Sequence, residues 1–463
     1  MNFDTIIKGG TVVTASDTFQ ADIGILGETI ACIGINLKSD APCQEIDASG
    51  KIVIPGGIDV HVHLQLPFCG TVSSDDFLTG TKAAARGGVT TVIDFAIQDA
   101  EKGLMAGIEA RMQEADPKVC VDYALHSIIT NWNEAIKREM TEVIKFGIPT
   151  FKMFMIYEKE GWQSDDAALF SALEATAKNG ARICVHAESE KVMSHLIAKY
   201  LPEKEKHGAY AHVLSRPNYI EAEAVQRVIK WAEVTGGRLY IVHLSTGEAA
   251  HLVWEAQQMG IDVQAETCPQ YLLLDDEVFK DPDRGHLFAT CPQIKKQEDS
   301  ERLWEALTAG ELTIVATDTC TFDTKQKAMW DGDFTKIPFG MPGVETLLPS
   351  VYTAGVLEER FSLNHFVSLI SANPAKLMGL YPQKGALAVG SDADVVIIDP
   401  QKKKEVDWQE LATNCDWSPF QGMELAGFAE TTLSRGKVVV KDGAFVGNQG
   451  HGKFVKRQAW GEV

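Results

Sequence analysis

The strongest fold signal in the chain is the stretch Pro55-Gly56-Gly57-Ile58-Asp59-Val60-His61-Val62-His63-Leu64. It reads as an apolar strand that ends in two histidines, His61 and His63. Side chains alternate between the two faces of a strand, so residues two apart project in the same direction. The two imidazoles therefore point at one place, which suits a divalent metal ion. Two ordinary core or surface histidines remain the alternative unless further ligands follow later strands.

After Pro55 the sequence has a repeated β-α rhythm, in which short apolar runs alternate with segments of helical period. This alternation is typical of a parallel sheet covered by helices. Eight such units over roughly 260 residues match a (β/α)₈ barrel of the TIM type in size and order. The predicted strands are residues 58–64, 91–96, 121–127, 151–155, 181–187, 239–245, 262–267 and 313–318.

Some connections between these strands have recognisable ends. A helix over residues 165–178 is predicted, with Ser164 as its N-cap and Gly180 beyond its end. Another covers residues 246–259 and is stopped by Gly260. The long connection over residues 268–294 is predicted to be an inserted loop beside the site.

Both ends of the chain are rich in β-forming residues. Within residues 1–54, Gly9-Gly10 indicates a hairpin between two short runs. Near the C-terminus, residues 393–399 predict a buried strand, and residues 431–445 predict a hairpin that turns at Lys441-Asp442-Gly443. The last dozen residues, rich in Gly and Lys, are predicted to form a tail.

We therefore predict an α/β fold with two domains. Residues 1–54 and 385–463 form a small β-sandwich domain from both chain termini, and residues 55–384 form the catalytic barrel inserted between them. The length of 463 residues suits two domains. A hydrophobic content of 45% with 23% charged residues is that of a soluble globular protein.

Charge and cysteine content limit the partners and the compartment. A formal net charge of −21 opposes binding to nucleic acid or to an anionic membrane. Nine scattered cysteines without a Cys-x-x-Cys motif argue against a disulfide framework or a zinc ribbon and favour a reducing compartment. The N-terminus lacks the pattern of a signal peptide, and no apolar run has the length of a membrane span. We expect a cytoplasmic protein.

Ligand-capable side chains close five of the predicted barrel strands. Barrel enzymes build their active sites at the C-terminal rim of the strands, so these groups are expected to converge there. Chance placement explains one or two such groups but not six. The candidate metal ligands are His61, His63, Lys152, His186, His243 and Asp318.

Lys152 is unusual in this set, because an ammonium group is repelled by divalent cations. Burial and nearby positive charge lower a lysine pKa from its ordinary value of about 10.4. A neutral amine takes up CO₂ to give a carbamate, a carboxylate-like group long enough to bridge two metal ions. The alternative is a charged lysine that extends to the rim.

In this order the six residues resemble the binuclear amidohydrolase superfamily. The dihydropyrimidinase and D-hydantoinase family is closer, and the similarity covers nearly the whole chain, including residues 385–400. The motifs that carry it are His61-Val62-His63-Leu64-Gln65-Leu66-Pro67-Phe68, Ser74-Asp75-Asp76-Phe77, Phe151-Lys152-Met153-Phe154-Met155-Ile156-Tyr157 and Glu266-Thr267-Cys268-Pro269-Gln270-Tyr271-Leu272.

The resemblance implies two divalent metal ions, usually zinc, bridged by Lys152 as N6-carboxylysine. His61, His63 and Asp318 would hold one ion, and His186 and His243 would hold the other. A hydroxide between the ions would attack the ring carbonyl of a cyclic amide. Asp318 would move the proton to the departing ring nitrogen, and Tyr157 would donate a hydrogen bond to the oxyanion. For Tyr157 alone, a half-buried structural aromatic is the alternative. A homotetramer is also implied by resemblance only.

The chain departs from the family pattern at three positions. Cys291-Pro292-Gln293-Ile294-Lys295 stands where Ser-Pro-Pro-Leu-Arg is usual, and Phe339-Gly340 stands where Asn-Gly is usual. Thr319 replaces the usual His after Asp318. The first two positions hold the cyclic amide largely through backbone groups in the family. A phenylalanine there makes the wall bulkier and puts the natural substrate in question. The substrate-binding candidates are Tyr157, Cys291, Phe339, Leu66, Phe68 and Phe154, with core packing as the competing role for the three phenylalanines.

The leading prediction is a metal-dependent hydrolase that opens 5,6-dihydropyrimidines or 5-substituted hydantoins to N-carbamoyl amino acids. Allantoinase-like activity, or another cyclic ureide or imide hydrolase, remains an alternative. Dihydroorotase is disfavoured, because it has Arg at the position of Gln65. A non-catalytic assembly protein on the same fold is the alternative from another class, and it conflicts with the retention of all six ligand positions. A nucleotide-binding barrel lacks a Gly-rich phosphate loop.

Overall fold

The computed structural model describes residues 2–460, and its centre is an eight-stranded parallel sheet. The strands follow one another in chain order around the sheet, as a (β/α)₈ barrel requires. They are β6 (Gly57–Asp59), β9 (Val89–Ile97), β10 (Asp122–Ile128), β11 (Thr150–Phe154), β12 (Arg182–His186), β13 (Leu239–Ile241), β14 (Val263–Thr267) and β15 (Ile314–Val315). The predicted barrel and its strand order are confirmed.

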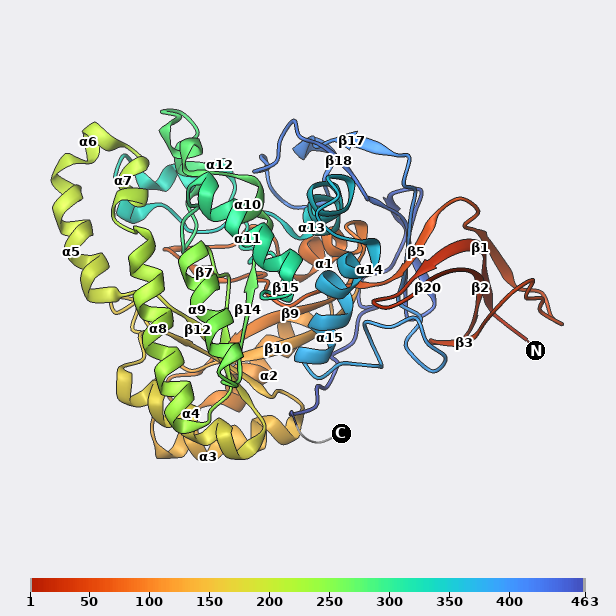
Figure 1. Ribbon diagram of the computed structural model, residues 1–463, viewed down its shortest axis with the longest axis horizontal. Coiled ribbons are helices and arrows are strands. Elements are labelled where there is room, and N and C mark those ends of the chain that lie inside the picture. Colours follow the sequence, from red (N-terminus) through yellow and green to blue (C-terminus); the bar gives the residue numbers. More distant parts are fainter. Residues whose placement is uncertain (1, 461–463) are drawn as a thin grey trace.

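Helices surround this sheet and connect its successive strands along the chain (Figure 1). One helix follows each of the first four strands: α1 (Phe77–Arg86), α2 (Leu104–Ala115), α3 (Glu134–Phe146) and α4 (Asp166–Asn179). After β12 the chain makes α5 (Glu190–Tyr200), α6 (Lys204–His207) and α7 (Tyr210–Leu214), an excursion at the edge of the molecule, before α8 (Asn218–Thr235). The later helices are α9 (Gly247–Gln258), α10 (Pro269–Leu273), α11 (Gln297–Ala309), α12 (Thr324–Lys327), α13 (Leu347–Val351), α14 (Leu363–Val367) and α15 (Asn373–Leu377).

The barrel closes between its first and last strands, beyond the ends of β6 and β15. Val62 and Thr319 form a parallel bridge there, and the backbone N–H of His63 donates to the Thr319 carbonyl at 2.7 Å. The first strand is shorter than predicted, because regular pairing stops at Asp59. His61 and His63 therefore lie in the extended segment that follows β6, still on the C-terminal rim.

The two chain ends share one nine-stranded sheet at the side of the barrel (Figure 1). Antiparallel pairing of β5 with β16 joins the two halves, so the predicted β domain built from both termini is confirmed. The boundaries at residues 54/55 and 384/385 stay a prediction. The N-terminal half contributes β1 (Thr5–Val13), β2 (Thr18–Leu26), β3 (Thr29–Gly34), β4 (Gln44–Asp47) and β5 (Ile52–Pro55), and the C-terminal half contributes β16 (Val395–Ile398), β19 (Ala429–Ser434), β20 (Lys437–Lys441) and β21 (Ala444–Phe445).

The remaining elements are short. Two small hairpins are β7 (Pro67–Phe68) with β8 (Thr71–Val72) and β17 (Lys403–Glu405) with β18 (Glu424–Ala426). The irregular helices are η1 (Leu201–Glu203), η2 (Asp276–Lys280), η3 (Gly285–Phe288), η4 (Ala328–Trp330), η5 (Phe334–Lys336), η6 (Val344–Thr346), η7 (Tyr352–Leu357), η8 (Ser368–Ala372) and η9 (Trp408–Glu410). Within residues 2–460, we find no helix with the length and hydropathy needed to cross a lipid bilayer.

Three local predictions are corrected by the structure. Gly9-Gly10 does not turn a hairpin: β1 runs through both glycines with a register shift, and Gly9 adopts a positive φ of 68°. Glycine tolerates that conformation, so the chain bulges without reversing. Asp165, not Ser164, caps α4, because its carboxylate accepts the backbone N–H of Ala168. Residues 431–445 make two hairpins, with a missed turn at Arg435-Gly436 besides the predicted one at residues 441–443.

The predicted C-terminal tail is wrong for the described residues up to Trp460. This segment is fixed across the end of the barrel opposite the rim, and Val455 and Arg457 are buried. Backbone N–H groups of Gly452, Arg457 and Trp460 donate to the carbonyls of Val119, Gly147 and Gly180, which precede β10, β11 and β12. Gly and Lys content misled the prediction, since backbone hydrogen bonding is independent of side-chain polarity. Residues 461–463 lie outside the described part.

Candidate metal and substrate site

One cavity at the C-terminal rim of the barrel gathers the predicted site residues. All twelve candidates from the sequence line it. They are the six metal-ligand candidates His61, His63, Lys152, His186, His243 and Asp318, and the six substrate candidates Leu66, Phe68, Phe154, Tyr157, Cys291 and Phe339. Ile128, Trp162, Cys320 and Gly340 complete the wall.

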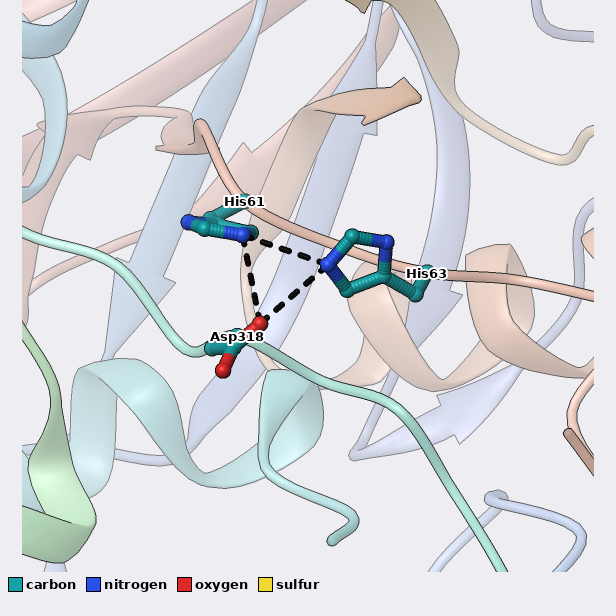
Figure 2. Close-up of side chains that lie close together, drawn as sticks. All are labelled: His61, His63 and Asp318. Atoms are coloured by element: carbon teal, nitrogen blue, oxygen red, sulfur yellow. Dashed lines mark hydrogen bonds and ion pairs between the residues drawn. The ribbon is translucent and has the colours of Figure 1, made fainter. Parts of the chain in front are cut away.

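Three side chains converge on one point of this cavity (Figure 2). The Asp318 Oδ1 atom lies 3.2 Å from His61 Nε2 and 3.3 Å from His63 Nε2, and the two nitrogens are 3.2 Å apart. A point equidistant from the three atoms lies about 1.9 Å from each, close to the zinc–nitrogen distance of about 2.0 Å. Two imidazoles and one carboxylate are ordinary zinc ligands, so the donor set fits a divalent cation.

The orientation of His61 is fixed from behind by Glu266. His61 Nδ1–H donates to Glu266 Oε1, which also accepts the backbone N–H of His243 at 3.1 Å. This bond leaves Nε2 of His61 as a lone pair aimed at the cavity. Burial lowers the pKa of His61 well below its ordinary value, which favours the neutral ring that a metal ion needs. Burial raises the pKa of Glu266 to about 7.

A second histidine pair lies across the cavity. The ring centroids of His186 and His243 are 4.5 Å apart. His186 Nε2–H donates to Glu188 Oε2 at 2.7 Å, which leaves Nδ1 of His186 free to act as a ligand. His243 Nδ1 is buried and has no hydrogen-bond partner among the described residues, and the same is true of His63 Nδ1. A buried nitrogen without a hydrogen-bond partner costs free energy. A metal-ligand role for these imidazole rings accounts for part of that cost.

Lys152 lies at the floor of the cavity and is 1% exposed. Within residues 2–460, no carboxylate is within ion-pair distance of its Nζ atom, and no hydrogen bond holds it. Aromatic rings of Phe95 and Phe154 face it at 5.5 and 5.1 Å. Burial lowers the pKa of Lys152 to about 8, so a minor fraction of the amine is neutral at pH 7, and this fraction is far larger than for an exposed lysine. These surroundings fit carbamylation, which converts the amine into a metal-binding carboxylate.

Three cavity residues have strained backbones. Tyr157, His243 and Asp318 have φ values of 70°, 40° and 52°, in the left-handed region that non-glycine residues rarely adopt. Such a conformation costs on the order of 1 kcal/mol at each position. Each lies just beyond the regular end of a barrel strand, where the chain turns to aim a side chain inward. This placement matches the general tendency of strain to collect at functional sites.

One end of the cavity is aromatic. The centroid of the Phe68 ring lies 5.5 Å from that of Tyr157 and 5.6 Å from that of Trp162. The ring centroids of Phe154 and Trp162 are 5.5 Å apart. The other end is formed by Cys291 and Phe339. A neutral ring substrate with an apolar substituent fits such walls, because apolar surface of the substrate and of the walls is then removed from contact with water.

Cys291 is part of a buried polar cluster. Arg216 Nη1 donates to Glu188 Oε2 at 2.9 Å and to Cys291 Sγ at 3.0 Å, and the thiol is 3.2 Å from Glu188 Oε2. Attraction to the Arg216 guanidinium is the main effect that holds the pKa of the Glu188 carboxyl well below its usual range, although burial acts in the opposite direction. Cys291, which stands where Ser is usual in the family, therefore contacts an ion pair that also orients His186.

Thr319, the third departure from the family pattern, does not line the cavity. Its hydroxyl is 2.7 Å from the Thr317 hydroxyl, which donates to Asp59 Oδ2. Sequence reasoning missed the supporting roles of Asp59, Glu188, Arg216 and Glu266. Glu188 and Glu266 had a usable signal, because each is a polar residue at the end of an apolar strand. Arg216 had none, since it comes from the segment between α7 and α8.

Comparisons with known proteins agree with this geometry. The family model described as "Amidohydrolase family" matches residues 52–439. A D-hydantoinase of Geobacillus stearothermophilus is 41% identical over 461 residues, which cover 99% of this chain and 97% of that protein. A D-phenylhydantoinase of Escherichia coli O1:K1 is 38% identical and covers 98% of each chain. The crystal structure of dihydropyrimidinase from Brevibacillus agri NCHU1002 has a TM-score of 0.96 at 40% identity, covering 99% of this chain and all of that one. The chain belongs to the amidohydrolase family, among relatives that include D-hydantoinases and dihydropyrimidinases.

Proposed function

We propose that this protein is a metal-dependent hydrolase that opens 5-substituted hydantoins or 5,6-dihydropyrimidines to N-carbamoyl amino acids. The observation that carries the proposal is the convergence of the six candidate ligands and the six candidate substrate contacts on one cavity. Full-length similarity to proteins named D-hydantoinase and D-phenylhydantoinase supports the substrate class. The aromatic end of the cavity suits an apolar substituent on the ring.

We propose two divalent metal ions, zinc in the first instance, with Lys152 as N6-carboxylysine between them. His61, His63 and Asp318 hold one ion, and His186 and His243 hold the other. Bound there, the ions supply Lewis-acid polarisation of the ring carbonyl and lower the pKa of the attacking water. The close approach of three ligand atoms, and the lack of a carboxylate within ion-pair distance of Lys152 among residues 2–460, support this assignment.

Asp318 and Tyr157 are the proposed catalytic residues. Asp318 holds its carboxylate beside His61 and His63, and accepts the proton of the attacking water before passing it to the departing ring nitrogen. Burial raises the pKa of Tyr157 well above its ordinary value, so its hydroxyl stays protonated. A protonated phenol is a hydrogen-bond donor for the oxygen that gains negative charge on the ring carbonyl.

Backbone groups near Cys291 and Phe339 are proposed to hold the cyclic amide. Gly340 N–H donates to the Ala289 carbonyl at 3.0 Å, which keeps the two loops adjacent. This placement makes the family differences at residues 291 and 339 compatible with binding, since the amide is contacted through the main chain. We further propose a homotetramer, on family likeness, and a cytoplasmic location, which is supported by nine free thiols.

Turnover of defined substrates tests the proposal. Metal-replete protein is expected to hydrolyse phenylhydantoin or dihydrouracil, with the N-carbamoyl product followed by chromatography. Chelation abolishes the activity and added zinc restores it. Asp318→Asn keeps the shape of the side chain but removes the proton acceptor, so kcat falls by about a hundredfold or more. Absence of turnover of both substrates by protein with intact metal would reject this substrate class.

A further inference from the structure

Tyr157 lies on a strained turn three residues beyond β11, and one buried carboxylate holds this turn. The φ of Tyr157 is 70°, in the left-handed region. Its backbone N–H donates to Glu190 Oε2 at 3.1 Å. Glu190 is the first residue of α5 and is 7% exposed. A hydrogen bond to a carboxylate is stronger than one to a neutral oxygen, so this bond offsets part of the strain of the turn.

The pairing of β11 with β12 brings Glu190 to Tyr157. Phe154 lies opposite His186 in this pair, and the backbone N–H of Met155 donates to the His186 carbonyl at 3.0 Å. The chain beyond β12 therefore runs beside the chain beyond β11, and Glu190 reaches back from α5 to the turn. One short segment thus carries both a candidate metal ligand and the carboxylate that holds Tyr157.

The surroundings of Glu190 are unusual for a buried carboxylate. Its Oε1 atom accepts the Ser194 hydroxyl at 2.7 Å, and its Oε2 atom accepts the Tyr157 N–H. Among the residues that the structure describes, no Lys, Arg or His side chain forms an ion pair with it. Burial of a carboxylate without an ion pair costs free energy, so this position is expensive for a side chain that only fills space.

His243, a second strained residue of the cavity, is held in the same way. Its φ is 40°, and its backbone N–H donates to Glu266 Oε1 at 3.1 Å. Glu266 is buried and belongs to β14, the strand that follows β13 in the sheet. In both cases a residue that turns just beyond one strand is bound through its N–H by a buried carboxylate from the chain of the next strand. This repetition associates the carboxylate with the strained turn itself.

We propose that Glu190 is a positioning residue for Tyr157, and that its carboxylate holds the left-handed turn which aims the phenol into the cavity. Glu190 does not itself line the active-site cavity. Ring contacts with Phe68 and His186, at centroid distances of 5.5 and 5.6 Å, act on the side chain and not on the turn from which it starts. Without the carboxylate the N–H loses its acceptor, and the turn relaxes and displaces the phenol. The inference rests on the proposed function for the catalytic role of Tyr157.

Replacement of Glu190 tests the inference. Glu190→Ala removes the acceptor, and kcat is expected to fall about tenfold or more while KM changes less than about threefold, because an oxyanion donor acts in the transition state. Glu190→Gln keeps an oxygen in the same place and is expected to retain most of kcat. Glu158→Ala removes an exposed acidic side chain that pairs with Lys191, and this control should keep the wild-type kcat. Elemental analysis is expected to show unchanged metal content in all three variants.

Combination with Tyr157→Phe shows whether Glu190 acts through Tyr157. The phenylalanine has no hydroxyl to position, so Glu190→Ala is expected to lower kcat by less than about twofold in that background. An equal loss of kcat in the two backgrounds, or wild-type kcat in Glu190→Ala alone, would overturn the inference.

Crystal structures of the variants give a readout that needs no turnover. In Glu190→Ala the φ of Tyr157 is expected to become negative and the hydroxyl to move, whereas both should stay in place in Glu190→Gln. An unmoved Tyr157 in Glu190→Ala contradicts the inference, whatever the kinetics show. Should Glu190→Ala fail to fold, Glu190→Asp takes its place with the same expected displacement, because it keeps the charge but is one methylene shorter. A displaced Tyr157, together with full activity of Tyr157→Phe, would instead reject the proposed catalytic role of Tyr157 and leave the positioning role of Glu190 in force.

Discussion

At the scale of single residues, the proposed chemistry depends on Lys152. A buried lysine without a carboxylate partner is expensive as an ammonium ion, because nothing repays its desolvation. Among the described residues no carboxylate lies within ion-pair distance of Lys152; Asp318 and Glu266 attract its charge from farther away, but burial outweighs them and lowers the pKa of Lys152 to about 8. Carbamylation removes the positive charge and supplies a ligand in the same step. The same burial that would destabilise a free lysine therefore favours the modified one.

Lys152→Ala is expected to remove this ligand. The metal content of the purified protein should fall, and kcat/KM should drop by more than about a thousandfold, or about 4 kcal/mol of transition-state stabilisation. Elemental analysis and kinetics measure both effects, and added short carboxylic acids should restore part of the activity by replacing the lost carbamate. Lys145→Ala, at an exposed position on α3, is the control and should retain full metal content. Normal metal content in Lys152→Ala would contradict the bridging role.

At the scale of elements, Lys327 links the two loops that carry Cys291 and Phe339. It is the last residue of α12 and is completely buried. Its Nζ atom donates to the Ala289 carbonyl at 3.0 Å and to the Pro338 carbonyl at 2.7 Å. These carbonyls lie two residues before Cys291 and one before Phe339. Sequence alone assigned Lys327 no role, yet its hydrogen bonds hold these two loops together.

Lys327→Met is expected to loosen both loops and to raise KM more than it lowers kcat. The buried Pro338 carbonyl loses its Lys327 donor, at about 1–3 kcal/mol in unfolding free energy, whereas the Ala289 carbonyl keeps the Gly340 N–H. Burial lowers the pKa of Lys327 to about 7, so between pH 7 and the ordinary lysine pKa of 10.5 the unfolded chain binds more protons at this residue than the native protein. The contribution of Lys327 to stability therefore rises with pH across this window. Denaturant unfolding of wild type and variant at about pH 6 and about pH 9 should show a larger difference at the higher pH. A smaller difference there would refute the assignment.

At the scale of the whole molecule, Lys384 joins the barrel to the terminal sheet. Its Nζ atom lies 2.7, 2.9 and 2.8 Å from carboxylate oxygens of Asp122, Asp392 and Asp394. Asp122 belongs to β10 of the barrel, and Asp394 precedes β16 of the terminal sheet. The three carboxylates alone resemble a cation site, but the ammonium group fills their centre. The cluster is therefore a structural ion network between the two parts of the fold.

Lys384→Met should leave three buried carboxylates without their ammonium partner. Removing one member of a buried ion network costs about 3–5 kcal/mol, so the denaturant midpoint should fall accordingly. Lys403→Met breaks the exposed pair with Glu424, and its loss should stay below about 1 kcal/mol. Equal effects of the two substitutions would show that the buried network adds nothing beyond a surface pair.

Much of the fold was predictable because it depends on local patterns. Apolar runs separated by helical periods predicted eight strands in the right order, and β-rich ends predicted the terminal sheet. Errors arose where a pattern has two structural outcomes. Gly9-Gly10 forms a bulge instead of a turn, and residues 452–460 lie against the barrel instead of forming a tail. In each case the outcome depends on partners distant in sequence, which a local pattern does not contain.

The sequence by itself determined the type of every candidate ligand and its place within or just beyond a barrel strand, because these follow from residue identity and period. Only the tertiary structure decided how close His61, His63 and Asp318 come and which carboxylates orient the histidines. It also decided that no carboxylate within residues 2–460 forms a direct ion pair with Lys152, and that Tyr157 and Phe339 line two neighbouring pockets. Distances, burial and shared walls are properties of packed chain segments, and they arise only when strands and loops far apart in sequence meet.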